Sequence, residues 1–241
     1  MQKIQKIEYA VGAAGVFVAH LHQEGFDRGM IATFGNHFRV VQGFTSTESY
    51  IHYALRGLVD QVNHDVRNNQ GQRTRLYDSI EDVITEFWRN GRRDRPWLLT
   101  VITDGQDNES SKYRNNPAAI GRYIGQRFNH EPSNFIFVIG VGEGNQIDRR
   151  ALGTMADSGN FLAMTIAAFP FLELAFLQIA VNVSSTLVGR RIQVGNMSWE
   201  EVAHLRQVSR IPLDYGFLLD CSGSMSEPGQ WIKWFWRTRA S

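Results

Sequence analysis

Three short runs of almost continuous apolar residues constrain the fold of this chain more than any other feature. They cover residues 97–102, 135–139 and 215–219, and their letters are WLLTVI, FIFVI and YGFLL. A run of this kind, without regularly alternating polar residues, is typical of a strand that is buried on both faces of a parallel sheet. The chain is therefore predicted to build a central parallel sheet that is covered by helices on both sides.

Helical periodicity fills much of the remaining chain. Apolar residues recur at steps of three and four, which places them on one face of a helix with 3.6 residues per turn. Asn116 and Pro117 are residue types that favour the N-cap and the first turn, so they mark the start of one such segment. The predicted helices cover residues 3–24, 47–63, 75–90, 117–128, 147–157 and 170–188.

Two further features complete the predicted sheet. Residues 29–34 and 38–41 carry strand-forming residues on either side of Gly35 and Asn36, and we expect an antiparallel hairpin there. A short strand is expected at residues 160–164. The alternation of strands and helices predicts an α/β fold, a doubly wound, Rossmann-like three-layer sandwich. Its central sheet should be mostly parallel, with one antiparallel edge strand.

The length of the chain favours one domain. A protein of 241 residues can form one large domain or two small ones, and one is the better expectation for a layered α/β fold. The segment 189–213 is polar and carries a capping-box-like pattern from Ser198 to Glu201, so we interpret it as a linker with a short helix. The predicted single domain 1–241 comprises a body (3–188), this linker (189–213), a strand with its loop (214–226) and a tail (227–241).

Charge and cysteine content argue against several classes of protein. The formal net charge of +1 gives no reason to expect binding to nucleic acid. Cys221 is the single cysteine, so an intramolecular disulfide is impossible and a reducing, cytoplasmic location is expected. The apolar stretch 165–189 contains Pro170 and Glu173, and it is predicted to be a buried helix rather than a membrane span.

Oxygen-bearing side chains stand at points where predicted strands end. Some directly follow the run 215–219, one follows the run 97–102, and one lies just before the helix 75–90. Open α/β sheets bind ligands outside the carboxyl ends of their strands, so these residues are placed to meet at one edge. Two carboxylates with neutral hydroxyls suit Mg²⁺, with Mn²⁺ or Ca²⁺ as alternatives. The predicted metal ligands are Asp220, Ser222, Ser224, Thr74 and Asp104.

Each of these residues also has an ordinary structural interpretation. An Asp-x-Ser-x-Ser segment by itself is a common turn. Thr74 could be the N-cap of the helix 75–90, and Asp104 could cap a helix or a turn. The combination of all three pieces on matching elements favours the metal site.

The same residues resemble the metal-ion-dependent adhesion site of von Willebrand factor type A domains. The neighbouring letters agree, because FLLDCSGSM is similar to the family's first strand and metal loop, and TRLYDSI is similar to its threonine loop. LLTVITDGQDN and FIFVIGVG are similar to its fourth and fifth strands. The resemblance covers residues 3–188 and 214–226 and implies the type A fold.

The order of these pieces departs from the family, in which the Asp-x-Ser-x-Ser motif precedes the helix that begins this chain. Moving residues 214–226 in front of residue 3 would restore the family order, so the chain resembles a circular permutant. Residues 189–213 could reach roughly 80 Å when extended, which is enough to join the old ends. A second interpretation is a window cut from a tandem array of domains.

The resemblance implies metal-dependent protein binding, as in adhesion or scaffolding, with an Asp or Glu of the partner as a further metal ligand. It implies no catalysis, and the long linker predicts a monomer that completes its own sheet. Two alternatives stay open at this stage: a structural module that forms oligomers by exchanging the strand 214–219, and a metal-dependent hydrolase, for which the motifs supply no positioned base.

An aromatic and basic tail follows the resemblance. It could be an interfacial or partner-binding element, a packed terminus, or a segment without a selected function. Its aromatic residues are Trp231, Trp234, Phe235 and Trp236.

Overall fold

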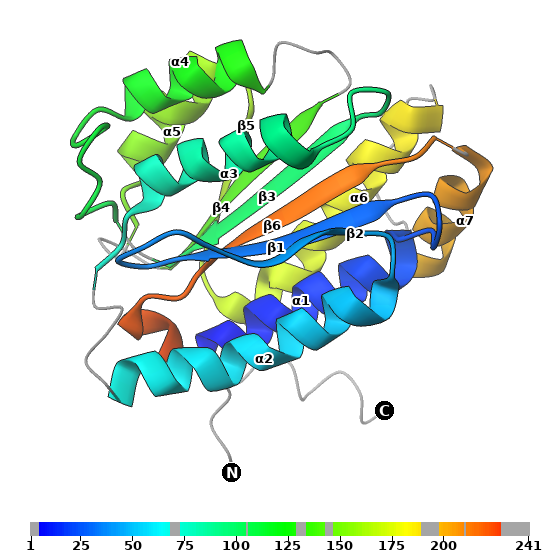
Figure 1. Ribbon diagram of the computed structural model, residues 1–241. Helices are drawn as coiled ribbons and strands as arrows, with labels where there is room; N and C mark the ends of the chain where they lie inside the picture. Colours follow the sequence, from blue (N-terminus) through cyan, green and yellow to red (C-terminus); the bar gives the residue numbers. More distant parts are fainter. Residues whose placement is uncertain are drawn as a thin grey trace, which may run out of the picture.

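The computed structural model describes residues 5–67, 73–104, 106–128, 134–142, 147–188, 198–209 and 211–227. In this part of the chain the strands form a six-stranded sheet with the order β2-β1-β6-β3-β4-β5 (Figure 1). β2 is antiparallel to β1, and the other neighbouring strands are parallel. The strands are β1 (Arg28–Phe34), β2 (Arg39–Thr45), β3 (Trp97–Thr103), β4 (Phe135–Val141), β5 (Leu162–Ile166) and β6 (Asp214–Asp220).

Helices cover both faces of this sheet (Figure 1). One face packs against α1, α2 and α6, with Phe17 and Phe217 in its apolar core. The other face packs against α3, α4 and α5, with Phe87 and Leu218 in a second core. The predicted doubly wound α/β sandwich with one antiparallel edge strand is therefore confirmed. The helices are α1 (Lys6–Leu21), α2 (Glu48–Arg67), α3 (Leu76–Asn90), α4 (Pro117–Arg127), α5 (Arg149–Gly159), α6 (Leu172–Val188) and α7 (Trp199–Ser209), with short 3₁₀ segments η1 (Phe169–Phe171) and η2 (Gly223–Ser226).

The last strand in the sequence, β6, lies in the middle of the sheet. Leu218 pairs with Ala32 of β1 on one side and with Val101 of β3 on the other. All residues of β6 are buried, as expected for a strand with helices on both faces. A Cβ atom at Gly216 would lie 3.0 Å from the ring of Phe87, so glycine allows α3 to pack closely here. The strand completes the sheet of its own chain.

Local signals placed the start of α4 correctly, whereas β2 and α2 each extend four residues beyond their predicted ends, to Thr45 and Arg67. The side chain of Asn116 accepts the N–H of Ala119 at 3.1 Å, so it is the N-cap of α4 as predicted. The first helix ends at Leu21, earlier than predicted, because the backbone at His22 is extended. Gly25 follows in a left-handed conformation with φ of 81°, which continues the turn into β1.

The short helix expected within the segment 189–213 is α7, and it is packed into the fold. α7 contacts α1 and α6, and the guanidinium of Arg206 donates to the buried carboxylate of Asp27. The same carboxylate accepts the N–H of Leu213 at 2.8 Å, just before β6 begins. Asp27 precedes β1, so this crossing lies at the amino ends of the strands, opposite the predicted metal edge. No signal in the sequence indicated this burial, because Arg206 lies on a short helix with other charged residues, Glu200 and Glu201.

The apolar helix α6 was predicted to be part of the core rather than a membrane span. No helix among the described ranges is both long and apolar enough to span a bilayer. Phe176 and Ile179 of α6 are fully buried, which agrees with the prediction of a core helix. The Trp-rich tail lies outside the described residues.

Candidate metal centre

The carboxyl ends of β3 and β6 bring the predicted site residues to one edge of the sheet. Ile102 pairs with Leu219, so Asp104 and Asp220 follow neighbouring positions of two parallel strands. The hydroxyl of Thr103 donates to Oδ2 of Asp220 at 2.8 Å, which orients this buried carboxyl group. The sheet extends in both directions from β6, and ligands of open α/β sheets bind at such a position.

Four of the five predicted ligands form one hydrogen-bonded cluster. The hydroxyls of Ser222 and Ser224 lie 3.0 Å apart, and Ser224 donates to Oδ1 of Asp104 at 2.7 Å. The N–H of Ser222 donates to Oδ1 of Asp220 at 2.9 Å, which holds the loop against the strand end. Residues 104 and 220–224 are therefore in contact although they are more than a hundred positions apart in the chain.

Thr74 lies at the same edge, but in the described part of the chain its hydroxyl makes no hydrogen bond to the other four predicted ligands. Its carbonyl oxygen accepts the N–H of Asn108 at 3.0 Å, in the loop that follows Asp104. Gly35 holds the segment of Thr74 and Arg75 beside the metal motif. The carbonyl of Gly35 accepts the N–H of Arg75, and a Cβ atom at Gly35 would lie 3.6 Å from the backbone nitrogen of Ser222. These backbone contacts place Thr74 near the metal motif, and its role as a ligand stays a prediction.

The structure excludes one alternative for Thr74. The N-cap of α3 is Arg75, which makes no side-chain capping bond, so Thr74 is not the cap of this helix. Its side chain is buried at this edge without that role.

Burial makes the two aspartates an electrostatically expensive pair. Desolvation, followed by the nearby charge of Asp104, raises the pKa of Asp220 to about 7. Buried carboxylates need a cation or hydrogen-bond donors around them. The neighbouring hydroxyls of Ser222 and Ser224 are neutral, and their oxygen atoms can also act as metal ligands. A divalent cation of the Mg²⁺ type prefers this combination of carboxylate and hydroxyl oxygen, so the donor set fits such an ion. Among the described residues, no group of three His, Cys, Asp or Glu side chains forms a metal cluster, which leaves these two carboxylates as the acidic part of the site.

Sequence reasoning missed Lys6 as a member of this site. Its Nζ lies 2.7 Å from Oδ2 of Asp104 and 3.2 Å from the carboxylate of Glu227. The signal was weak, because Lys6 stands in the polar first turn of a predicted helix. These contacts place the first turn of α1 and residue 227 beside Asp104.

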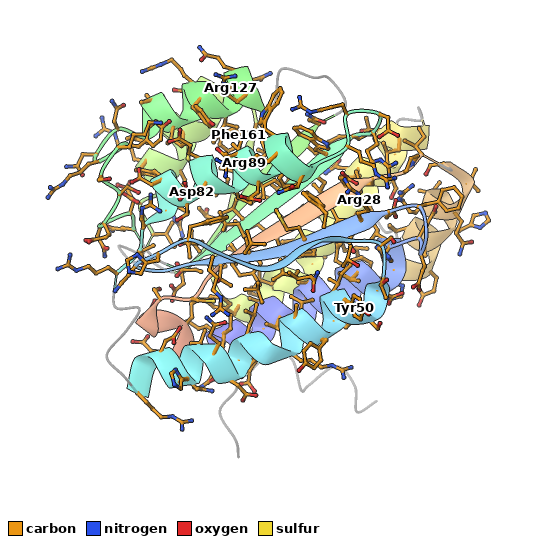
Figure 2. The ribbon with its side chains drawn as sticks, viewed as in Figure 1. Arg28, Tyr50, Asp82, Arg89, Arg127 and Phe161 are labelled. Atoms are coloured by element: carbon orange, nitrogen blue, oxygen red, sulfur yellow. The ribbon has the colours of Figure 1, made fainter. Side chains whose placement is uncertain are left out.

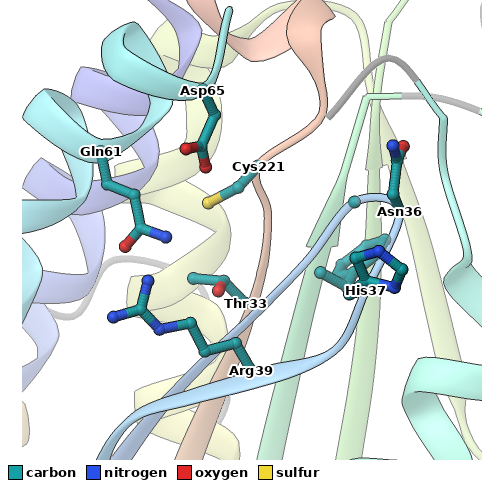
Figure 3. A pocket seen from close by; sticks show the side chains of 9 residues that line it. Thr33, Asn36, His37, Arg39, Gln61, Asp65 and Cys221 are labelled. Carbon is teal, nitrogen blue, oxygen red and sulfur yellow. The ribbon is translucent and has the colours of Figure 1, made fainter. Parts of the chain in front are cut away.

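A hollow of about 390 Å³ opens beside the metal motif (Figure 3). Gln61 and Asp65 of α2 face Thr33 and Arg39 of the β1–β2 hairpin across it, and the thiol of Cys221 points into it. Since Cys221 stands between Asp220 and Ser222, a group in this hollow would lie next to the candidate metal ligands. Burial raises the pKa of the Cys221 thiol, which keeps it protonated and unreactive.

Comparisons with known proteins now give this architecture a family context. No protein-family model and no curated protein matches the sequence. Among solved structures, the SpRpn10 VWA domain matches with a TM-score of 0.52 and 13% identity over 79% of this chain and 87% of that domain. A von Willebrand factor type A structure from Catenulispora acidiphila has a TM-score of 0.48 and 17% identity, covering 70% of this chain and 36% of that one. BatB from Bacteroides thetaiotaomicron has a TM-score of 0.45 and 15% identity, covering 72% and 86%.

The fold and the edge cluster define the class of doubly wound α/β domains that carry oxygen-bearing side chains at the carboxyl ends of their central strands. Within this class, the match to the SpRpn10 domain shows that the chain has the fold of a von Willebrand factor type A domain. The fold expected from the metal motif and the strand letters is thereby confirmed.

Proposed function

We propose that this protein binds a protein partner through a divalent cation at the carboxyl edge of β3 and β6. The ion is Mg²⁺, with Mn²⁺ or Ca²⁺ as possible substitutes, and the partner supplies an Asp or Glu carboxylate as a further ligand. The proposed ligands are Asp220, Ser222, Ser224, Thr74 and Asp104, acting directly or through water.

One observation carries this proposal: Ser222, Ser224 and Asp104 form a continuous chain of oxygen atoms at 3.0 and 2.7 Å, beside the buried carboxyl of Asp220. Two charged aspartates from different strands repel each other, and the ammonium of Lys6 offsets this repulsion at Asp104. A bound divalent ion would add positive charge that both carboxylates share and an electrophilic position for one more carboxylate.

A binding role follows from the composition of the site. Three of the proposed ligands are neutral hydroxyls, so little of the ion's charge is neutralised by the protein and a carboxylate from outside is favoured. A hydrolase would need a positioned general base near the ion. None of the predicted ligands is a histidine, and both aspartates are already engaged in hydrogen bonds. We therefore infer that the protein is not an enzyme.

The first experiment measures metal binding itself. Calorimetric titration of Mg²⁺ or Mn²⁺ into chelator-stripped protein should give one site per chain, and the Asp104→Ala, Ser222→Ala double variant should lose it. Asp157→Ala is the matched control, because it removes a carboxylate from the exposed surface of α5 and should bind like wild type. Equal heats for the wild type and the double variant would refute the metal site.

The second experiment tests the role of the ion in partner binding. Immobilised wild-type protein should capture its partner in Mg²⁺ and release it in EDTA, while the Asp104→Ala, Ser222→Ala variant should capture nothing. Capture that ignores the chelator would refute the ion-linked mode of binding.

We further propose that the chain is a circularly permuted type A domain, working as a monomer in the cytoplasm. The central position of β6 supports the permutation, because this late strand occupies the place between β1 and β3 and carries the metal motif. Pairing of β6 within its own chain supports a monomer. The single, buried Cys221 suits a reducing compartment.

A further inference from the structure

A cation of the chain itself lies against the candidate metal site. The ammonium of Lys6 contacts Oδ2 of Asp104 at 2.7 Å, and the Asp104 side chain is only 1% exposed. A contact shielded in this way is screened by salt much less than a surface ion pair. The N–H of Lys6 also donates to the carbonyl oxygen of Glu227 at 3.0 Å, which holds the start of α1 beside the metal loop.

The two oxygens of Asp104 therefore face different partners. Oδ1 accepts the hydroxyl of Ser224, which belongs to the metal motif, and Oδ2 accepts the ammonium of Lys6. A divalent ion that uses Asp104 must either share this carboxylate with Lys6 or displace it. In both cases two positive charges compete for one buried carboxylate, and Coulomb repulsion over a few ångströms is strong in such surroundings.

We propose that Lys6 is an internal counter-cation of the metal site, which neutralises Asp104 in the metal-free protein and lowers the affinity for the divalent ion. This inference rests on the proposed function and adds a control on it. The ammonium of Lys6 also contacts Glu227 at 3.2 Å, so displacement of Lys6 by the ion would disturb the contact between the start of α1 and residue 227. The occupancy of the site is thereby coupled to the two segments that meet at residues 6 and 227.

The test compares Mn²⁺ affinity by calorimetry in chelator-stripped wild type, Lys6→Met and Lys6→Arg. Lys6→Met should bind the ion at least tenfold more tightly, because the competing charge is gone. Lys6→Arg keeps the charge and should stay within threefold of wild type. Arg89→Met is the matched control, since it removes one positive charge from α3 (Figure 2), where the partner of Arg89 is Glu86 at 3.6 Å.

Thermal unfolding gives a second readout that does not depend on partner binding. Metal-free Lys6→Met should melt at a lower temperature than wild type, because Asp104 loses its cation, and saturating Mn²⁺ should raise its melting temperature by more than in wild type. Lys6→Gln, which keeps a hydrogen-bond donor, serves if Lys6→Met fails to fold. Equal affinities of wild type and the neutral variants would overturn the role of Lys6 and leave the metal site intact. No Mn²⁺ binding by any variant would refute the metal site, and this inference with it.

Discussion

The ion pair between Arg206 and Asp27 tests whether α7 belongs to the folded core. The Arg206 side chain is 1% exposed and that of Asp27 is fully buried. Asp27 also accepts the N–H groups of Gln23 at 2.9 Å and Leu213 at 2.8 Å, so it joins the end of α1, the start of β1 and the entry to β6. Desolvation raises the pKa of Asp27 even though the charge of Arg206 opposes this change. Removing the guanidinium would leave a buried charge without a cation.

Arg206→Met should therefore destabilise the protein by about 3–5 kcal/mol, the usual cost of breaking a buried pair by removing one partner. For a chain of this length the melting temperature should fall by roughly 6–20 °C. Urea unfolding followed by circular dichroism measures the effect, and the midpoint should shift without a change in slope.

A second substitution separates the cost of the unpaired charge on Asp27 from the loss of the contact made by Arg206. Asp27→Asn added to Arg206→Met removes the charge but keeps an oxygen for the N–H of Leu213, so the double variant should recover part of the lost stability. Arg73→Met is the control, because its pair with Glu109 is largely exposed and such pairs contribute about 0–1 kcal/mol. The reasoning is refuted if Arg206→Met costs no more than this control, or if the double variant is no more stable than the single one.

Three further predictions concern the site, the core and the chain order. The pKa of Asp220 is raised to about 7 in the folded protein, from an ordinary value of 3.8. The protonated side chain therefore stabilises the metal-free protein at pH values below 3.8, and this contribution is lost as the pH rises through 7. Metal-free protein should accordingly melt earlier at pH 8 than at pH 6, and Mg²⁺ affinity should rise over the same interval in calorimetry. Phe217→Ala removes a ring packed 5.5 Å from Phe17 and should cost about 3–5 kcal/mol in urea unfolding. The exposed Phe26→Ala control should change stability by about 0.5 kcal/mol or less. The last variant is a rearranged chain in which a few glycines join residue 227 of the segment 198–227 to residue 5 of the segment 5–188. It should fold and bind Mg²⁺ like the original, because residues 6 and 227 are already hydrogen-bonded. An unfolded product would contradict the permutation.

Local chemistry explains how much of the fold could be predicted. The apolar runs became β3, β4 and β6 because a strand covered on both faces has no position for a solvent-facing residue. The capping box was visible because it is a local feature. The hydroxyl of Ser198 accepts the N–H of Glu201 at 3.3 Å, only three residues away. The candidate metal residues could be named because parallel strands deliver their carboxyl ends to one edge.

Contacts between distant parts of the chain were decided by the tertiary structure. Lys6 and Asp104 are 98 residues apart, and Arg206 and Asp27 are 179 apart. Periodicity and capping report the surroundings of a residue over one or two turns, so they indicate that a lysine starts a helix but not which carboxylate it meets. The sequence by itself determined the elements, the sheet type and the set of candidate ligands. Only the packing of α1 against β6, and of α7 against α1 and α6, decided which charged side chains are buried together, since that depends on the relative placement of whole elements.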